Sequence, residues 1–393
     1  MLQVKMYPAR NGDAFLIRAD GKNVLVDCGF ATTFRQHIAH DLRGLSRAGE
    51  RLDLLIATHI DADHILGLIA LLDENGQPDA RNIIKIDEIW HNSLRSLAAQ
   101  SHEHITSSEK TLLESFVRRG YPATMELTAN EISAKQGSSL AAAIHRNEYR
   151  WNGGDGRQSV SRGGVSLRFD GGGTVQVIGP HPQRLTALSN WWIAELRKHG
   201  YSGPTGSGDL LDDAFELVCA RAPAAQSLRP ISISSGESRR LADVYEADTS
   251  VTNGSSIATI IEMSGVRMLF LGDAWAEDVV EELERLRSDG QSLLFDAVKI
   301  SHHGSLRNTS PALLDLIDSP TYFISSSGAL HDHPDFEVLT AIVDRPAAFE
   351  RNLYFNYQTK ASVRLRAYPS PANAKFVVHE DATSWIEVQP TQA

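Results

Sequence analysis

Hydrophobic and polar positions alternate with a period of two near the start of the chain. Because the side chains of a strand point to opposite faces in turn, this alternation predicts antiparallel strands joined by tight turns. These strands are predicted over residues 1–7, 14–18 and 23–26. Residues 52–57 form a run that is apolar except for Asp53, which predicts a strand buried on both faces, and residues 65–72 follow with helical spacing. An α/β sheet protein is therefore expected.

The middle of the chain has a different pattern. Residues 93–148 have mainly helical spacing, and 153–173 are rich in Gly, Ser and Arg and read as a loop. The stretch 179–253 is largely irregular apart from a predicted helix. Regular patterns return afterwards. Within the middle stretch, a strand is expected at 174–178 and a helix at 185–199. After it, the expected elements are hairpin 256–271, helix 277–287, strand 297–300, helix 311–317, strand 321–325, helix 335–343 and further strands within 353–388.

Composition narrows the function classes. The chain has 393 residues, and single hydrophobic cores stop growing at ~250–300 residues. We therefore expect two domains or one large sandwich with insertions. The net charge of −11 makes non-specific binding of polyanions unfavourable, so a phosphate-bearing substrate would need locally bound cations. Two cysteines are too few for a thiolate zinc site, which leaves imidazole and carboxylate ligands. Neither a membrane-length apolar run nor a signal-peptide layout is found, and a cytoplasmic protein is expected.

Four potential metal ligands lie within six residues after the first buried strand: His59, Asp61, Asp63 and His64. On an extended loop alternate positions point the same way, so His59 and Asp61 can face one cation. Asp63 and His64, where the chain turns into the helix, can face a second. The alternative is a polar loop in which Asp63 caps the following helix.

Two later strands also end in potential ligands. Asp273 follows the apolar run 269–272, and His302 follows the run 298–301. In open α/β sheets such strand ends form the ligand site, so these side chains would meet the first cluster from the opposite side. The alternatives are a helix cap for Asp273 and a hydrogen-bonded loop histidine for His302.

These motifs resemble the metallo-β-lactamase superfamily. The run THIDADH at 58–64 is similar to its signature His-x-[His/Asp]-x-Asp-His loop, and Asp27 in VLVDCG resembles its first motif. Residues 272–274 resemble the fourth motif, and 301–305 resemble the fifth motif as found in the ComEC-like branch. Residues 11–14 and 253–256 also resemble runs of that branch. The resemblance implies a four-layer αββα sandwich. Its N-terminal half would be 1–92, its C-terminal half 253–393, and 93–252 a helical and irregular insertion.

The resemblance also implies a ligand set for two divalent cations. Zn²⁺ is favoured, and Mn²⁺ or Fe would also suit imidazole and carboxylate. His59 and Asp61 would hold the first cation. The second would be held by Asp63, His64 and His302, with Asp273 bridging both. Asp61 stands where many relatives carry histidine. The expected third-motif histidine is missing: Asn253 takes its place, and His181 is an outside candidate.

Further residues are candidates for catalysis and substrate contact. Asp63, His303 and His333 are the catalytic candidates. His303 is expected to point away from His302 toward a leaving group or phosphate oxygen, and His333 to act as a general acid. Lys299, with Asn253 and His181, is a substrate-side candidate. Ordinary surface histidines and a core or solvated lysine are the alternatives.

The predicted function is a metal-dependent hydrolase that uses a metal-bridging hydroxide. A phosphodiesterase or nuclease acting on DNA, RNA or a nucleotide-like phosphodiester is favoured, because a dinuclear centre suits phosphoryl oxygens. The acidic charge fits a short single strand better than a long duplex. Two alternatives remain: a carbon-centred hydrolase acting on a lactam, lactone or thioester, and a non-catalytic regulatory module of the same fold. No membrane partner is expected.

Overall fold

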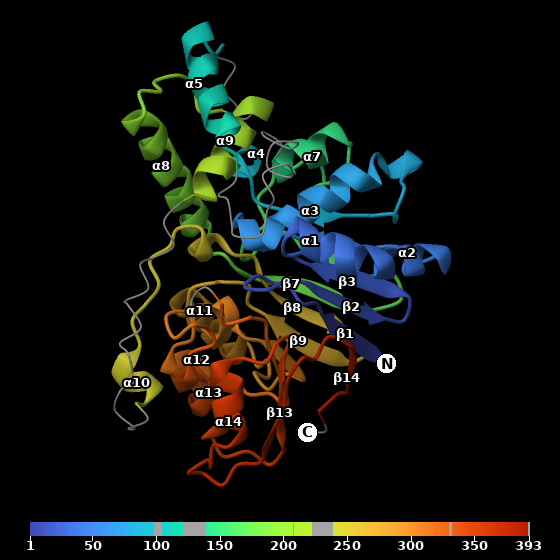
Figure 1. Cartoon of the computed structure of the whole chain (residues 1–393), viewed down its shortest axis with the longest axis vertical. Helices are drawn as coiled ribbons and strands as arrows, with labels where there is room; N and C mark the ends of the chain where they lie inside the picture. Colours follow the sequence, from blue (N-terminus) through green and yellow to red (C-terminus); the bar gives the residue numbers. More distant parts are fainter. Residues whose placement is uncertain (98–103, 121–138, 207, 222–238, 330–331, 392–393) are drawn as a thin grey trace.

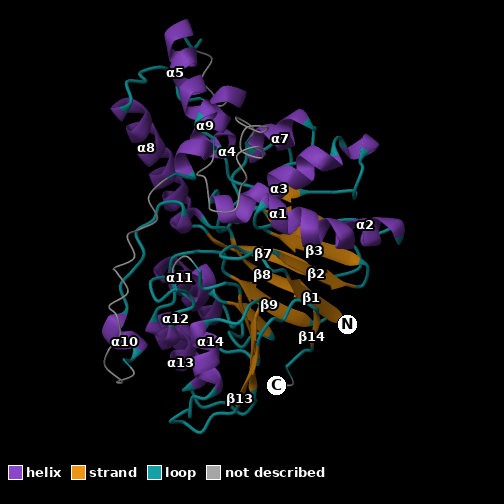
Figure 2. Cartoon of the chain, viewed as in Figure 1, coloured by secondary structure: helices purple, strands orange, loops and turns teal. Residues whose placement is uncertain are grey.

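Two mixed β-sheets lie face to face, and helices cover the outer face of each (Figures 1 and 2). The computed structural model describes residues 1–97, 104–120, 139–206, 208–221, 239–329 and 332–391. This arrangement confirms the predicted αββα sandwich. Most predicted strands and helices are present, with ends that differ by a few residues.

The first sheet contains six strands. In spatial order they are β14 (Trp385–Val388), β1 (Leu2–Met6), β2 (Phe15–Ala19), β3 (Lys22–Val26), β4 (Leu54–Ile56) and β5 (Ile89–Trp90). Pairing is antiparallel from β14 to β3 and parallel from β3 to β5. The strand nearest the C-terminus thus pairs with the strand nearest the N-terminus, with Leu2 opposite Val388. The tail, which lies outside the motif resemblance, completes this sheet.

The second sheet contains eight strands. In spatial order they are β13 (Phe376–His379), β12 (Arg351–Phe355), β11 (Thr321–Ile324), β10 (Ala297–Lys299), β9 (Val266–Phe270), β8 (Ala258–Met263), β7 (Thr174–Gly179) and β6 (Ser166–Arg168). Strands β9 to β13 are parallel, and the others pair antiparallel. Both β6 and β7 come from the segment predicted as an insertion, and β6 lies in the stretch read as a loop. The division of the chain at residues 92 and 253 stays a prediction.

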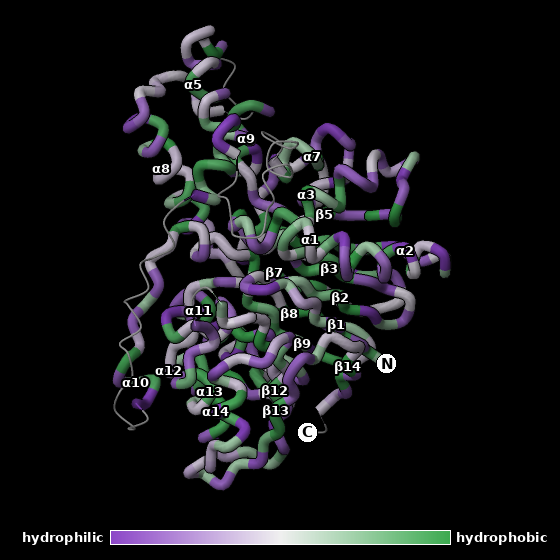
Figure 3. The backbone as a smooth tube through the Cα atoms, in the orientation of Figure 1, coloured by the Kyte–Doolittle hydropathy of each residue, from purple (hydrophilic) through white to green (hydrophobic). Residues whose placement is uncertain are grey.

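The alternation along the strands builds the core between the sheets. Val4 and Met6 of β1 face inward, and Met268 of β9 faces them from the second sheet. Phe15 packs edge-on against Phe270, with ring centroids 5.4 Å apart. Figure 3 shows these central strands as mainly hydrophobic. Burial of these apolar faces stabilises the sandwich by about 25 cal/mol for each Å² removed from water.

Helices cover both outer faces. The first sheet is covered by α1 (Ala31–Thr33), the π-helical η1 (Phe34–Ile38), α2 (Ala39–Arg47) and α3 (Ala62–Asn75). The second is covered by α11 (Ala276–Ser288), α12 (Pro311–Leu316), α13 (Phe336–Val343) and α14 (Lys360–Arg366), with α10 (Leu241–Val244) beside α13. Short 3₁₀ turns are η2 (Pro78–Ala80), η3 (Asn253–Ser255) and η4 (Ser301–Gly304). The helical run 31–47 and α14 were not predicted.

A helical arm stands on the first sheet's side of the sandwich. It consists of α4 (Leu94–Leu97), α5 (Ser107–Arg118), α7 (Leu140–Arg146), α8 (Pro182–Lys198) and α9 (Asp209–Cys219), and α5, α8 and α9 lie at the top of Figure 1. The predicted helical stretch 93–148 partly lies outside the described residues. Within the described ranges, no helix has both the length and the apolar character needed to cross a membrane.

The two sheets meet closely where β4 and β9 end. The amide N–H of Ile257 donates to the carbonyl of Thr58 over 2.8 Å. Gly272 has φ +52°, and a Cβ there would lie 3.1 Å from Cβ of Thr58. Only glycine combines this left-handed backbone with so close an approach. The strand ends that carry the predicted ligands therefore lie side by side.

Candidate metal centre

The loop between β4 and α3 carries the first ligand cluster. His59 and His64 are buried, whereas Asp61 and Asp63 are partly exposed. Asp61 occupies the N-cap position of α3, but its side chain makes no capping hydrogen bond. The carboxylate of Asp63 accepts from Asn11 Nδ2 over 2.9 Å. Neither carboxylate is thus used to cap the helix, and the structural alternative for this loop is not supported.

Asp27, directly after β3, holds this loop in place. Its Oδ1 accepts from the amide N–H of Thr58 over 2.8 Å, and its Oδ2 accepts from Thr58 Oγ1 over 2.7 Å. His64 Nδ1 lies 2.8 Å from the same Oδ2. Asp27 is fully buried, so these three donors compensate for removing its charge from water. This matches the supporting role that the first motif implied.

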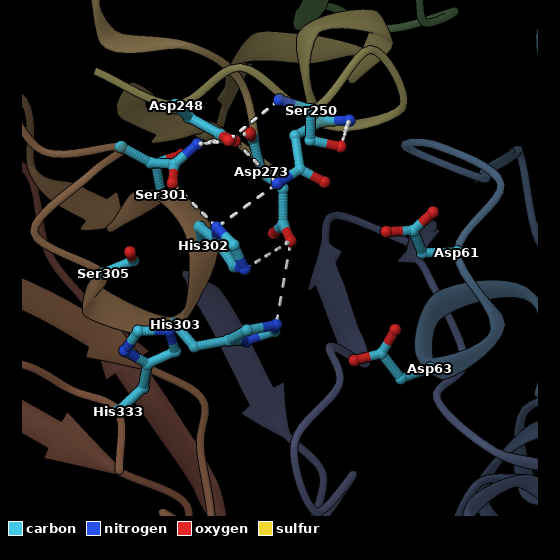
Figure 4. Close-up of polar contacts among 12 residues, drawn as sticks. Asp61, Asp63, Asp248, Ser250, Asp273, Ser301, His302, His303, Ser305 and His333 are labelled. Atoms are coloured by element: carbon cyan, nitrogen blue, oxygen red, sulfur yellow. Dashed lines mark hydrogen bonds and ion pairs between the residues drawn. The ribbon is translucent and has the colours of Figure 1, made fainter. Parts of the chain in front are cut away.

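Four imidazoles converge on one carboxylate oxygen. Asp273 Oδ2 lies 3.7 Å from Nε2 of His59, 3.7 Å from Nε2 of His64 and 3.7 Å from Nε2 of His302. His303 Nε2 lies 3.8 Å from the same oxygen. Figure 4 shows Asp273 facing His302 and His303, with Asp61 and Asp63 across from it. Segments separated by more than 200 residues thus contribute to one centre.

The opposite ring nitrogens are all held by partners, which fixes each imidazole. Asp27 holds Nδ1 of His64, and the carbonyl of Ser325 lies 2.8 Å from Nδ1 of His303. The hydroxyl of Thr58 is used toward Asp27, so its oxygen accepts from Nδ1 of His59 over 3.1 Å. These contacts place the ring protons on Nδ1, which leaves an Nε2 lone pair for a cation.

The donor set fits divalent cations. Nε2 of His59, Nε2 of His64 and Oδ1 of Asp273 are buried without a hydrogen-bond partner among the described residues. Four groups each have potential ligand atoms within 4.8 Å of one another: His59, His64 and Asp273; Asp63, His64 and His303; Asp273, His302 and His303; and Asp13, Asp27 and His64. Zn–N bonds are ~2.0–2.1 Å long, so donors 3.7 Å apart can contact the same ion. The mix of imidazole and carboxylate suits zinc and other transition metals.

The buried carboxylates and imidazoles of the centre shift one another's pKa values. Burial raises the pKa of Asp273, but the surrounding imidazoles, with His302 and His64 foremost, outweigh it and hold that pKa well below its ordinary value. Burial lowers the pKa of His64, yet Asp273 and Asp27 raise it well above its ordinary value. The centre therefore favours positive charge next to Asp273.

His302 and His303 are arranged differently from the prediction. The prediction assumed an extended chain with the two side chains pointing apart. Instead both residues have left-handed backbones, with φ +45° and +57°, and both Nε2 atoms face Asp273. This prediction is wrong, because η4 turns the chain after β10. It is His303 that groups with Asp63 and His64, whereas His302 was expected to complete that set.

The substrate-side candidates lie in different surroundings. Lys299 is buried, forms an ion pair with Asp13 and donates to the carbonyl of Gly272 over 3.0 Å. Its ammonium group is therefore used inside the protein, which argues against a contact with substrate phosphate. His181 accepts from the amide of Gln183 and caps α8, and it joins no ligand group among the described residues. These positions argue for structural roles.

His333 and Asn253 lie beside the centre. The ring centroid of His333 is 5.5 Å from that of His302, and its Nδ1 is 3.3 Å from Asp335 Oδ2. Asn253 Nδ2 lies 3.4 Å from His302 Nδ1 and donates to Asp248 over 2.7 Å. The neighbouring His331 lies outside the described residues.

Sequence reasoning missed three buried polar residues around the centre. Asp13 was noted only as part of a motif, yet Lys299 and the His303 ring hold its pKa below the ordinary value despite burial. Asp248 and Asn308 were not considered at all. The local sequence around Asp248 and Asn308 does not indicate a role at the site, because the two residues contact each other across 60 positions of the chain.

Known proteins resemble this chain in sequence over part of its length. Residues 7–145 match the family model described as the Metallo-beta-lactamase superfamily. The chain is 35% identical over 80 residues to a ribonuclease Z from Bradyrhizobium diazoefficiens, which covers 20% of this chain and 24% of that protein. It is 30% identical over 97 residues to a ribonuclease Z from Metallosphaera sedula, covering 24% of this chain and 31% of that protein. The chain thus spans only a quarter to a third of these relatives' length.

A solved structure is similar over a longer span. The metallo-beta-lactamase fold protein YhfI from Bacillus subtilis aligns over 98% of this chain and 100% of its own, with 10% sequence identity and a TM-score of 0.37. The ComEC-like branch is not represented among these matches, and the assignment to that branch stays a prediction.

Proposed function

We propose, from the premise that this chain has the metallo-β-lactamase fold and matches that superfamily over residues 7–145, that it is a dinuclear metal-dependent hydrolase of phosphodiesters. The observation that carries the proposal is the convergence of four imidazole Nε2 atoms on Asp273 Oδ2. Asp61 and Asp63 lie across from that oxygen (Figure 4). Such a cluster of buried nitrogen and oxygen donors is costly for a fold to maintain without a bound cation.

The ligands divide between two cations. His59 and Asp61 would hold the first, and Asp63, His64 and His303 the second, because His303 is the histidine that groups with Asp63 and His64. Asp273 would contact both, since its Oδ2 is equally close to imidazoles of each set. His302, which groups with Asp273 and His303, supplies the fourth imidazole.

Two divalent cations bound here would polarise a phosphoryl oxygen and lower the pKa of water. The residues of the chain would do the remaining work. Asp27, Thr58 and Ser325 hold three imidazoles so that their Nε2 atoms point inward. His333, whose ring lies beside that of His302, would donate a proton to the leaving oxygen.

A phosphodiester is favoured over a carbonyl substrate by the matched relatives. Both are named ribonuclease Z, although they match over only 80 and 97 residues. The net charge of −11 argues against tight binding of long duplexes. A short single strand or a nucleotide-like phosphodiester therefore fits this chain best.

The test compares substrates and variants. The metal-loaded protein should hydrolyse bis-p-nitrophenyl phosphate, and His64→Ala should lower that activity by at least about a hundredfold, because it removes a ligand. His145→Ala is the matched control, since His145 is half exposed on α7 and belongs to none of the ligand groups. Turnover of nitrocefin or a lactone alone would favour a carbon-centred hydrolase instead. Absence of bound metal would favour a non-catalytic module.

A further inference from the structure

His302 is the least enclosed of the four converging imidazoles. Its side chain is 24% exposed, against 0% for His59, 0% for His64 and 5% for His303. An imidazole at such a position can rotate unless a partner holds its other nitrogen. Nδ1 of His302 lies 2.7 Å from Oδ1 of Asn308, which is completely buried.

The amide of Asn308 is itself held in one orientation. Its Nδ2 donates to Asp248 Oδ2 over 2.9 Å and to the carbonyl of Asp273 over 3.0 Å. Because both contacts require a donor, the amide oxygen must face His302. An amide oxygen only accepts, so His302 carries its ring proton on Nδ1 and keeps the Nε2 lone pair toward Asp273.

Asp248 is the charged end of this arrangement. It is 3% exposed, although it lies in the irregular segment between α10 and η3. Its Oδ2 accepts from Asn253 Nδ2 over 2.7 Å as well as from Asn308, and its Oδ1 accepts from the amide of Ser250 over 3.0 Å. Figure 4 shows Asp248 beside Ser250, with dashed contacts leading to His302 and on to Asp273.

We propose that Asp248, acting through Asn308, is a positioning residue that holds His302 as the fourth imidazole of the metal centre. The inference rests on the proposed function, because it needs the centre to bind cations. Asp248 does through an amide what Asp27 does directly for His64. A carboxylate behind a ligand imidazole also makes its free nitrogen a better donor.

With Asp248 in this role, the centre would have a fourth imidazole without a third-motif histidine. The sequence place of that histidine is taken by the Asn253 region. Asp248, from the same segment, accepts from Asn253 and from Asn308, and Asn308 in turn holds His302. The fourth imidazole is thus supplied by η4 and oriented by a carboxylate from the loop before β8.

The test is a double-mutant cycle read out by Co²⁺ binding alone. Asp248→Asn offers one acceptor oxygen where Ser250, Asn253 and Asn308 present three N–H donors to the two carboxylate oxygens, so the contact that orients Asn308 is weakened. We expect Co²⁺ affinity to fall about 10–100-fold and the visible Co²⁺ spectrum to change, as for His302→Ala. In the His302→Ala background, Asp248→Asn should cause no further loss, because both act on the same ligand.

Matched variants separate positioning from folding. Asp243→Asn, an exposed carboxylate of α10, should leave Co²⁺ affinity unchanged. The exchange Asp248→Asn with Asn308→Asp should recover part of the affinity, since the new carboxylate can accept directly from His302 Nδ1. Defects in folding that are common to both backgrounds cancel in the cycle, and thermal unfolding records them.

The outcomes distinguish this inference from the proposed function. Failure of the unsubstituted protein to bind Co²⁺ would overturn both. Binding that His302→Ala leaves unchanged, or losses from Asp248→Asn and His302→Ala that simply add, would overturn the positioning role and leave the metal centre intact.

Discussion

Two buried aspartates in different parts of the molecule have opposite electrostatic surroundings. Asp273, at the end of β9, is 3% exposed, and Asp212, on α9 of the helical arm, is 4% exposed. Burial alone raises the pKa of both. Around Asp273 the imidazoles reverse that effect and hold the pKa well below its ordinary value. Around Asp212 the nearby Glu216 adds to burial, and the pKa rises to about 8.

Burial by itself does not give a carboxylate the surroundings of a metal ligand. Among the described residues, Asp212 accepts a hydrogen bond from the amide of Arg95, and its raised pKa favours the neutral acid. Asp273 faces four imidazole Nε2 atoms, and under the proposed function a cation would be its partner. The proposal thus gives Asp212 a structural role and Asp273 a role in metal binding.

The largest effect is expected from removing the charge of Asp273. Asp273→Asn keeps the size of the side chain but leaves four imidazoles facing an amide. We expect the pair of cations to be lost or reduced to one, and phosphodiester hydrolysis to fall at least about a thousandfold. Metal content by mass spectrometry and the rate with bis-p-nitrophenyl phosphate measure this.

Asp243→Asn is the control for that substitution, since it removes an equal charge from an exposed position. Two cations kept at full occupancy in Asp273→Asn would contradict the contact of Asp273 with both ions.

A smaller effect is expected from Asp27, which holds the ligand loop in place and is not one of the proposed ligands. Asp27→Asn offers one acceptor oxygen where Thr58 and His64 present three donors, so His64 loses its fixed ring. Metal affinity should weaken about 10–100-fold, measured by competition with a chelator. Asp20→Asn is a close control, because Asp20 shares the left-handed backbone, with φ +51° against +53°, but is exposed. Unchanged affinity in Asp27→Asn would remove Asp27 from the support of the centre.

The smallest effect is expected in the arm and concerns pH. The folded-state pKa of Asp212, about 8, lies above the ordinary value of 3.8. The stability that this group contributes is thus present below pH 3.8 and is lost as pH rises through 8. Asp212→Asn removes this dependence, so the free energy of unfolding at pH 8 should rise by about 1–2 kcal/mol, with little change near pH 4. Urea unfolding at both pH values measures it, and a loss of stability at pH 8 would contradict the neutral state.

Much of the fold was predictable because the hydrophobic periods are strong. The alternation over 1–7 and the apolar run 52–57 predicted β1 and β4 within two residues of their bounds. The helical run 31–47 was missed, because it begins right after a motif with Gly29 and carries a π-helical turn. β6 was missed because three residues in a Gly-rich stretch give no usable period.

The two sides of the centre differed in how well they could be predicted. The N-terminal ligands lie within six residues, so their spacing alone indicated a site. The direction of the His303 side chain could not be predicted, because it depends on left-handed backbone angles at His302 and His303 that the sequence SHHGS does not indicate. The support from Asp248 depends on pairing with Asn308, 60 residues away, which no local pattern encodes.

The most direct test is the number of divalent cations bound by the purified chain, counted by native mass spectrometry before and after chelation. We expect two cations per chain, both removed by the chelator and both restored by Zn²⁺ together with phosphodiester hydrolysis. A chain that binds no divalent cation when Zn²⁺ is supplied, with His59, His64 and Asp273 intact, would contradict the proposed metal centre.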